Sequence, residues 1–338
     1  MDSSVALQLA HERGDEVTAF YLKIWLEDEL AYLGECPWEE DMAYARAVCD
    51  RFGIPLEIVP LQGEYLEKVV SVAIAELKAG RTPSPDIFCN QRIKFGAFLD
   101  RIDDDFDRII SGHYAQVDRT NGVAKLKRSP DLVKDQTYFL CNLAQEQVAR
   151  LDFPVGGLTK ERVRELAEAS DLPNKDRKDS QGICFLGKIK YPEFVKYHLG
   201  EERGDIVDIR TNERLGNHHG FWFHTIGQRQ GLRLGGGPWY VVEKDATTNT
   251  IYVSNTEEKE RRARKTFTLS ETNWISGVPN RERLKVKVRH GPSTSDASVR
   301  VEKEETHVSL DVGDPGIAPG QWAVLYDGDY CLGGGIIT

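Results

Sequence analysis

The first half of the chain alternates short apolar runs with segments whose apolar residues recur at helical spacing. Residues 17–23, 54–59 and 106–111 predict strands, and residues 41–52, 65–79 and 93–103 predict helices. Strands that alternate with helices of this length form a doubly wound parallel sheet. Because such sheets bind ligands at the carboxyl ends of their strands, we expect a ligand near Lys23, Ile24, Gly112 and His113.

The pattern then becomes helical over residues 145–151, 159–170 and 191–199, with Thr159 as the expected N-cap of the second helix. After Gly200, short alternating strands at 284–289, 297–302, 307–311 and 321–326 predict a small β-barrel or sandwich. The expected organisation is an α/β domain over residues 1–200, a small linker domain over 201–262 and a C-terminal β-barrel over 263–338.

Composition indicates the compartment and the kind of partner to expect. The 338 residues contain no apolar run long enough to span a membrane and no secretory signal. The six cysteines are scattered, without zinc-like spacing, which predicts a reducing compartment and no metal site. The net charge of −10 is unevenly placed, since residues 259–300 hold 11 basic against 4 acidic residues. A basic surface for a polyanion is therefore expected in the second half.

The chain begins with Asp2, Ser3 and Ser4, which precede an amphipathic helix that ends near Gly14. Two interpretations remain open at this point. The three residues could simply cap the helix, or the free N–H groups of the helix start could bind a phosphate.

Two cysteine segments are the strongest candidates for chemistry. In Gly80–Phe95, two prolines fix an extended turn that places Asp86 three residues before Cys89, just ahead of an expected helix whose dipole would lower the pKa of the thiol. In residues 178–187, Cys184 lies in a glycine-flanked apolar run beside a basic stretch. Taken alone, either cysteine could equally be an ordinary buried core residue.

Together, G-R-T-P-S-P-D-I-F-C-N and D-S-Q-G-I-C-F closely resemble the signature pair of the tRNA-specific 2-thiouridylases. That resemblance implies ATP-dependent 2-thiolation of the wobble uridine of a tRNA, by adenylation of the C2 oxygen and sulfur transfer from a cysteine persulfide. It implies Cys184 as the persulfide carrier, Cys89 as the attacking or resolving thiol that forms a disulfide with it, and Asp86 as an acid/base. Ser84 stands where the family usually has Asn.

Asp2-Ser3-Ser4 resembles the tail of the S-G-G-x-D-S loop of the N-type ATP pyrophosphatases, to which that family belongs. The resemblance implies an ATP site, with Mg²⁺, formed by Asp2, Ser3, Leu22 and Gly112. It begins inside the loop, so the sequence predicts either upstream residues that complete the loop or a catalytically inactive tRNA-binding relative. A third possibility is another adenylating enzyme of the same loop class, such as an amide-forming synthetase.

The same resemblance implies a set of tRNA contacts and partners. The expected contacts are Ser84, Pro85, Asp86, His113, Lys134, Asp135, Gln136, Arg289, His290 and Gln321. Lys285, Lys287 and Arg289 alternate along one expected strand and would present one charged face to RNA. The implied partners are tRNA and an upstream persulfide donor, with no membrane, for a monomer in the cytoplasm, or in a plastid or mitochondrion if a transit peptide precedes the chain.

Overall fold

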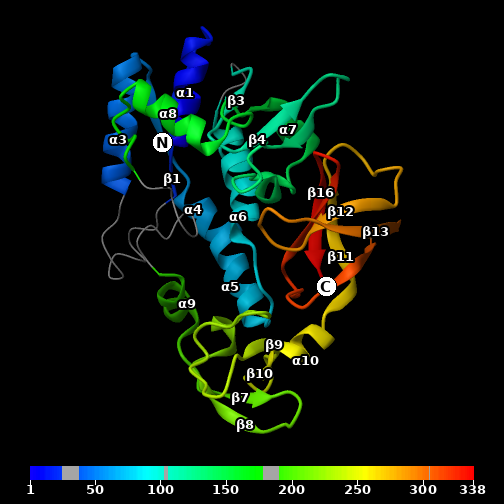
Figure 1. Cartoon of the computed structure of the whole chain (residues 1–338). Coiled ribbons are helices and arrows are strands. Elements are labelled where there is room, and N and C mark those ends of the chain that lie inside the picture. The colour runs from blue at the N-terminus through cyan, green and yellow to red at the C-terminus, as the bar shows by residue number, and fades with distance from the viewer. Residues whose placement is uncertain (25–37, 103–105, 178–189, 304) are drawn as a thin grey trace.

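The computed structural model describes residues 1–24, 38–102, 106–177, 190–303 and 305–338. Figure 1 shows three parts: an α/β region at the upper left, a barrel at the right and a small β region at the bottom. The long helical segment that includes α5 (Ser71–Lys78) runs from the first part toward the third, where α5 contacts α9 (Tyr191–Leu199).

The α/β region contains two pairs of parallel strands among the described residues. β1 (Ala19–Lys23) pairs with β2 (Leu56–Pro60), and β3 (Ile109–Ile110) pairs with β6 (Leu151–Asp152). The helices around them are α1 (Asp2–Glu12), α3 (Trp38–Phe52), α4 (Gln62–Tyr65), η2 (Leu66–Val70), α5, α6 (Pro85–Phe88), η3 (Cys89–Ala97), η4 (Leu99–Arg101), η5 (Thr137–Leu140), α7 (Gln145–Arg150) and α8 (Lys160–Ala169).

The predicted α/β class with parallel strands is confirmed, with two differences in detail. The expected strand over 106–111 is only two residues long, and the helix expected to start at residue 93 already begins at Pro85 and continues through η3. Proline is favoured at the first helical position because its missing N–H would have no partner there. Thr159 caps α8 as predicted, since its Oγ1 accepts a hydrogen bond from Arg162 N at 3.3 Å.

The small β region follows α9 and consists of a four-stranded sheet in the order β8-β7-β10-β9. Its elements are β7 (Gly204–Asp208), β8 (Arg214–His218), η6 (Phe221–Phe223), β9 (Tyr240–Asp245) and β10 (Thr250–Ser254), followed by α10 (Thr256–Arg261). Alternate residues of β7 and β10 are buried, as expected for strands with one face on the core.

The C-terminal strands close into a six-stranded antiparallel barrel, as predicted. Its order is β11-β14-β13-β12-β15-β16, and β16 pairs back with β11. The strands are β11 (Arg264–Trp274), β12 (Arg283–Lys287), β13 (Ser295–Glu302), β14 (Glu305–Asp314), β15 (Trp322–Asp327) and β16 (Tyr330–Ile337). Closure leaves no free sheet edge within the ring.

A hairpin from the α/β region extends this barrel, which the sequence did not predict. β4 (Ala115–Asp118) and β5 (Lys125–Arg128) pair with each other, and β5 pairs with β16 through Lys127↔Tyr330 and Leu126↔Cys331. One buried cluster accordingly includes residues of both parts, among them Leu126, Tyr138 and Trp322. The α/β region and the barrel therefore share a core. Within the described residues, no helix is long and apolar enough to span a membrane.

Candidate functional site

The start of α1 is held by contacts from distant parts of the chain. Lys160 Nζ donates to both carboxylate oxygens of Asp2, at 2.7 and 2.9 Å, and the Tyr114 hydroxyl donates to Asp2 Oδ1 at 3.1 Å. Asp2 therefore lies in the first turn of the helix and caps nothing, so the interpretation of this segment as a simple N-cap is wrong. The first intrahelical bond is Ser4 N to Met1 O, which leaves the N–H groups of Asp2 and Ser3 ahead of the hydrogen-bonded turns.

Gly112 packs directly against this helix start. A Cβ at position 112 would lie 2.4 Å from Ser3 N and 2.6 Å from the carbonyl carbon of Asp2, closer than side-chain atoms can approach. Position 112 must therefore be glycine for the strand end to meet the helix start as it does. The structure thus brings together Asp2, Ser3 and Gly112, which are distant in sequence.

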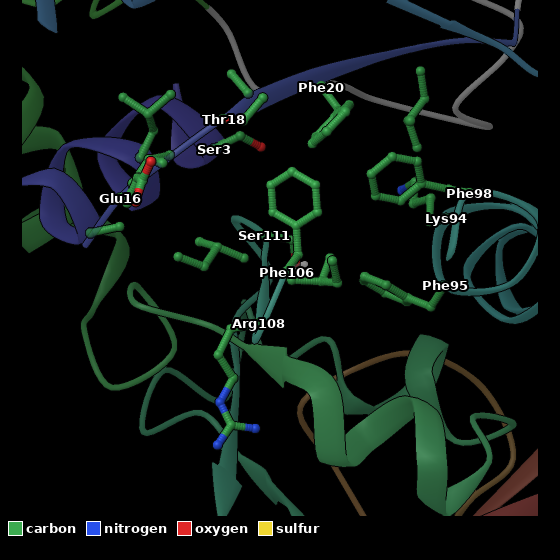
Figure 2. A pocket seen from close by; sticks show the side chains of 17 residues that line it. Ser3, Glu16, Thr18, Phe20, Lys94, Phe95, Phe98, Phe106, Arg108 and Ser111 are labelled. Carbon is green, nitrogen blue, oxygen red and sulfur yellow. The ribbon is translucent and has the colours of Figure 1, made fainter. Parts of the chain in front are cut away.

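A cavity of about 300 Å³ lies beside the same helix start, between β1 and β3. Its apolar wall includes Phe20, Phe98 and Phe106; the ring centroids of Phe20 lie 5.2 Å from Phe98 and 5.5 Å from Phe106. Figure 2 shows the rings of Phe20 and Phe106 between Ser3 on α1 and the opposite side of the cavity, where Phe98 and Lys94 lie. Leu22 and Ser111 also line the cavity. The predicted nucleotide residues Ser3 and Leu22 therefore face one space, which extends along β1 and the residues just before it.

His113 lies next to this region but carries no charge at neutral pH. Its Nδ1 is 2.8 Å from the Ser111 hydroxyl, and its ring packs against Phe95 and Phe153. Burial, together with the nearby ammonium of Lys94, lowers the pKa of His113 to about 3. A neutral imidazole can donate or accept a hydrogen bond but cannot attract a phosphate by charge.

Cys89 is buried inside a continuous helical run, not at a helix start. Pro85 begins that run after Ser84, Asp86 occupies its first turn, and Cys89 joins α6 to η3 with only 1 % of its surface exposed. The prediction that the helix dipole lowers the pKa of this thiol is therefore wrong in its premise, because the effect is confined to the first turn. It is the Asp86 carboxylate that lies at the favourable positive end.

The loop before Asp86 is braced against the barrel. Thr82 N donates to Pro319 O at 2.9 Å, and a Cβ at Gly320 would lie 2.8 Å from Arg81 Cβ. Gly320 also has φ +88°, which favours glycine. Gln321 follows at once, so this predicted tRNA contact lies beside the segment that carries Ser84, Pro85 and Asp86.

Asn90 connects the cysteine helix to the segment 134–139. Its Nδ2 donates to Asp86 O at 3.0 Å and to Phe139 O at 3.2 Å, and the side chain is 3 % exposed. The two sequence motifs, P-D-I-F-C-N and K-D-Q-T-Y-F, are therefore joined through one buried amide.

The predicted tRNA contacts from three further segments also converge. Gln136 and Tyr114 exchange two hydrogen bonds of 2.9 Å, which tie the 134–139 segment to the end of β3 and its Gly112-His113 turn. His290 Nε2 donates to Asp135 O at 3.3 Å, and its ring stacks on Phe139 at 4.6 Å. Arg289 is half-exposed and forms an ion pair with Asp314.

The expectation of one charged face on Lys285, Lys287 and Arg289 is wrong at Lys287. Lys285 is exposed and pairs with Asp296 at 3.0 Å, whereas the side chain of Lys287 is fully buried and pairs with Asp135 at 3.1 Å. The predicted contact Asp135 is equally buried, with both oxygens occupied by protein donors. An alternating pattern along a strand does not predict that Lys287 is buried, because its burial depends on pairing with the buried Asp135 carboxylate.

Three further cysteines lie in the described part, Cys49, Cys141 and Cys331, and all three are buried, as Cys89 is. Cys141 and Cys331 lie in the core shared with the barrel, where burial raises the pKa of Cys331 to about 12 and that of Cys141 well above its usual range. A thiolate is the reactive form, so neither suits nucleophilic chemistry. Cys331 is core, as predicted; Cys184 lies outside the described residues, and its predicted pairing with Cys89 stays a prediction.

The sequence did not indicate Lys160 and Arg128, which bind two of the predicted site residues. Lys160 Nζ binds Asp2, and Arg128 Nε donates to Asp135 Oδ2 at 2.9 Å. Lys160 follows the correctly predicted cap Thr159, but nothing in the local pattern indicates a partner 158 residues away. Arg128 at a strand end likewise gives no signal of an inward direction.

Three family models match the chain in succession. They are described as a tRNA methyl transferase HUP domain over residues 1–188, a tRNA methyl transferase PRC-barrel domain over 192–255 and an aminomethyltransferase beta-barrel domain over 264–337. Each range corresponds to one of the three parts seen in Figure 1.

Curated relatives match over the whole chain. A tRNA-specific 2-thiouridylase MnmA of Parabacteroides distasonis is 43% identical over 344 residues, covering 100% of this chain and 96% of the relative. The tRNA-specific 2-thiouridylase MnmA of Porphyromonas gingivalis and the tRNA-specific 2-thiouridylase MnmA 2 of Bacteroides fragilis are each 42% identical, covering 96% and 97% of the relative. With this identity and coverage, the chain belongs to the family of tRNA-specific 2-thiouridylases.

Proposed function

We propose that this protein is a tRNA uridine 2-sulfurtransferase, which replaces the C2 oxygen of the wobble uridine of a tRNA with sulfur in an ATP-dependent reaction. One observation carries the proposal: the helix that holds Asp86 and Cys89 is tied through Asn90 to the 134–139 segment, which in turn contacts His290 of the barrel. Three motifs of distant sequence are therefore connected to the helix that carries this thiol.

The start of α1 fits the phosphates of ATP. Free N–H groups at a helix start favour an anion, and Gly112 allows the strand end to approach without a side chain between them. Leu22 and the phenylalanine rings of the cavity offer an apolar surface to adenine. For Mg²⁺, the Asp2 carboxylate is the acidic group at this helix start, and Mg²⁺ commonly binds one or two carboxylates together with substrate phosphates. Its oxygens accept from Lys160 and Tyr114, so Mg²⁺ would have to share this carboxylate with them or displace them. ATP would supply the adenylate that turns the uridine C2 oxygen into a leaving group.

The two-cysteine chemistry follows from what sulfur transfer requires. The terminal sulfur of a Cys184 persulfide attacks C2 and AMP leaves, after which the Cys89 thiolate attacks the Cys184 sulfur and a Cys89–Cys184 disulfide forms as the thiocarbonyl is released. An external thiol reductant and a persulfide donor then restore Cys184. We assign the proton exchange with the target base to Asp86, which lies in the first turn of the same helix.

The tRNA surface that we propose includes His113, Lys134, Gln136, Arg289, His290 and Gln321, together with Ser84, Pro85 and Asp86. Arg289 and Lys134 supply positive charge for the backbone, and neutral His113 and Gln321 supply hydrogen bonds. Asp135 belongs to the proposed site by holding its neighbours, because its own carboxylate is buried.

The decisive experiment combines the full chain with tRNA, ATP and a persulfide donor, and measures 2-thiouridine by nucleoside mass spectrometry. We expect Cys89→Ser and Cys184→Ser each to abolish product, while the buried-core control Cys331→Ser retains it. Thiolation that survives in either of the first two variants would refute the proposed roles.

Measuring pyrophosphate release and tRNA binding with the same components separates the two alternative functions. An inactive tRNA-binding relative would bind tRNA but release no pyrophosphate from ATP. An amide-forming synthetase would release pyrophosphate with a free amino acid and without tRNA. We expect pyrophosphate release that requires tRNA.

A further inference from the structure

We propose that Lys287 is a positioning residue for tRNA binding, which holds Asp135 and thereby fixes the 134–139 segment of the α/β region against Arg289 and His290 of the barrel. This inference rests on the proposed function and deepens it. It assigns a role to a lysine that the sequence pattern would place on the RNA surface.

Lys287 is part of a buried ionic cluster around one carboxylate. Lys287 Nζ and Arg128 Nε donate to the same oxygen, Asp135 Oδ2, at 3.1 and 2.9 Å. The other oxygen, Oδ1, accepts from Thr137 Oγ1 at 2.8 Å and from the backbone N–H groups of Thr137 and Ser129 at 3.3 and 3.4 Å. Both oxygens of Asp135 are therefore saturated by protein groups, and the side chains of Asp135 and Lys287 are fully buried.

The cluster joins three separate pieces of the fold. Arg128 ends β5, Lys287 ends β12, and Asp135 lies in the segment between β5 and η5. Tyr326 of β15 lies near both cations: its ring centroid is 5.4 Å from the guanidinium of Arg128 and 5.5 Å from Lys287 Nζ. Figure 1 shows β12 and β16 beside the region that carries β4 and α7. The cluster therefore lies at the junction of the barrel with the α/β region.

The stretch 287–290 contacts the same segment at two points. Lys287 binds the Asp135 side chain, and three residues later His290 binds the Asp135 carbonyl and stacks on Phe139. The neighbours of these contacts, Lys134 and Arg289, are the positively charged groups of the proposed RNA surface. The distance between Lys134 and Arg289 depends on how residues 134–139 and 287–290 are held against each other.

Stability alone is a weak reason for such a cluster. Two cations and one carboxylate must all be desolvated, and buried ion pairs can often be replaced by apolar residues at little cost in stability. Burial alone would raise the pKa of Asp135, but Lys287 and Arg128 lower it, so the carboxylate is ionised and demands its partners. The cluster favours one defined arrangement of the 134–139 segment, because any displacement of Asp135 from its partners leaves a buried charge unpaired.

The test compares tRNA affinity of the full chain with Lys287→Met, Asp135→Asn, the double variant and Lys285→Met. Lys285 is the matched control, since it lies two residues earlier on the same strand and pairs at the surface. We expect Lys287→Met to weaken tRNA binding by about tenfold, because misplacement of about 1 Å is enough for such losses, and Lys285→Met by less than about threefold. Thiolation at saturating tRNA should change by less than about twofold in both, since Lys287 touches no reacting atom.

The double variant Asp135→Asn/Lys287→Met shows whether Lys287 acts on tRNA binding through Asp135. Asp135→Asn leaves Lys287 and Arg128 facing each other without a carboxylate, so removing Lys287 as well should restore part of the binding. A lysine that touched RNA directly would instead make the double variant weaker than Asp135→Asn. Thr137→Val, which removes one donor to Asp135 without unpairing a charge, serves if a charge variant fails to fold and should weaken binding about threefold or more.

Three results would overturn the inference: Lys287→Met with unchanged affinity and only a lower melting temperature, equal losses for Lys285→Met and Lys287→Met, or a double variant weaker than Asp135→Asn. A wild-type chain that binds no tRNA would overturn the proposed function itself and this inference with it. Wild-type binding with unaffected variants would overturn the inference alone.

Discussion

Lys160 Nζ lies 2.7 and 2.9 Å from the two carboxylate oxygens of Asp2, across 158 residues of sequence. Lys160 is 3% exposed and is the first residue of α8. The Asp2 carboxylate supplies the countercharge for its buried ammonium. The pair therefore fixes α1 to α8 at the end where the phosphates of ATP are proposed to bind.

The first prediction concerns this pair. Asp2→Asn should lower the free energy of unfolding by about 1–3 kcal/mol, because it leaves the buried ammonium of Lys160 without its countercharge. Urea unfolding measures the change. Asp2→Asn combined with Lys160→Met should recover part of the loss, and Lys175→Met, which breaks a surface pair with Glu168 and Asp171, should change stability by less than about 1 kcal/mol. A double variant less stable than Asp2→Asn would contradict the pairing.

The second prediction concerns the contact between Gly112 and α1. Gly112→Ala would place a methyl group 2.4 Å from Ser3 N, so the strand end and the helix start must move apart. We expect a loss of about 1–3 kcal/mol in stability, measured by urea unfolding, and weaker ATP binding by calorimetry. Gly235→Ala is the control, since nothing lies within 4 Å of the added methyl group. Equal behaviour of the two variants would rule out the tight contact.

The sequence predicted the helices and strands better than it predicted which strands pair with each other. Helices such as α8, and the strands of the barrel, follow from periodicity and a cap, because these signals are local. The β4–β5 hairpin that extends the barrel was missed, since pairing between Leu126 and Cys331 depends on residues 205 positions apart. Local pattern contains no information on such pairings.

The candidate site shows the same division. Motif resemblance located Asp86, Cys89 and the 134–136 segment, and the structure brings their neighbours into contact through Asn90. It could not tell that Lys287 and Asp135 point inward, because exposure of a charge depends on where its partner lies in three dimensions. The position of Cys89 within a helix, not at its start, was missed because Pro85 can begin a helix as well as end a turn.

The third prediction concerns the pH dependence of stability through His113. Its pKa is lowered to about 3 by burial, so the unfolded chain binds a proton below about pH 6.5 that the folded chain does not take up until about pH 3. The contribution of His113 to stability is therefore present above pH 6.5 and falls as the pH decreases toward 3. Between pH 7 and 5, His113 should account for a loss of about 1–2 kcal/mol.

Urea unfolding at both pH values, compared between the wild-type protein and His113→Gln, isolates this contribution from the carboxylates that titrate in the same range. The variant should lose less stability than the wild-type protein over that interval. His307→Gln, at an exposed histidine, should follow the wild-type curve. Equal pH dependence in His113→Gln and wild type would mean that His113 titrates normally.

The fourth prediction concerns Asn90, whose amide donates to two carbonyls, Asp86 O and Phe139 O. Asn90→Ala removes both bonds and should lower stability by about 1–3 kcal/mol, since two part-buried carbonyls each lose one donor. Asn90→Asp should be worse, although it is nearly the same size, because a carboxylate would face two carbonyl oxygens and repel both. Thermal unfolding and the apparent KM for tRNA measure the two effects. Asn142→Ala, which removes a half-buried bond to Gln91, is the control and should leave the KM unchanged. If Asn90→Asp proved milder than Asn90→Ala, Asn90 could not be acting as a donor between the cysteine helix and the 134–139 segment.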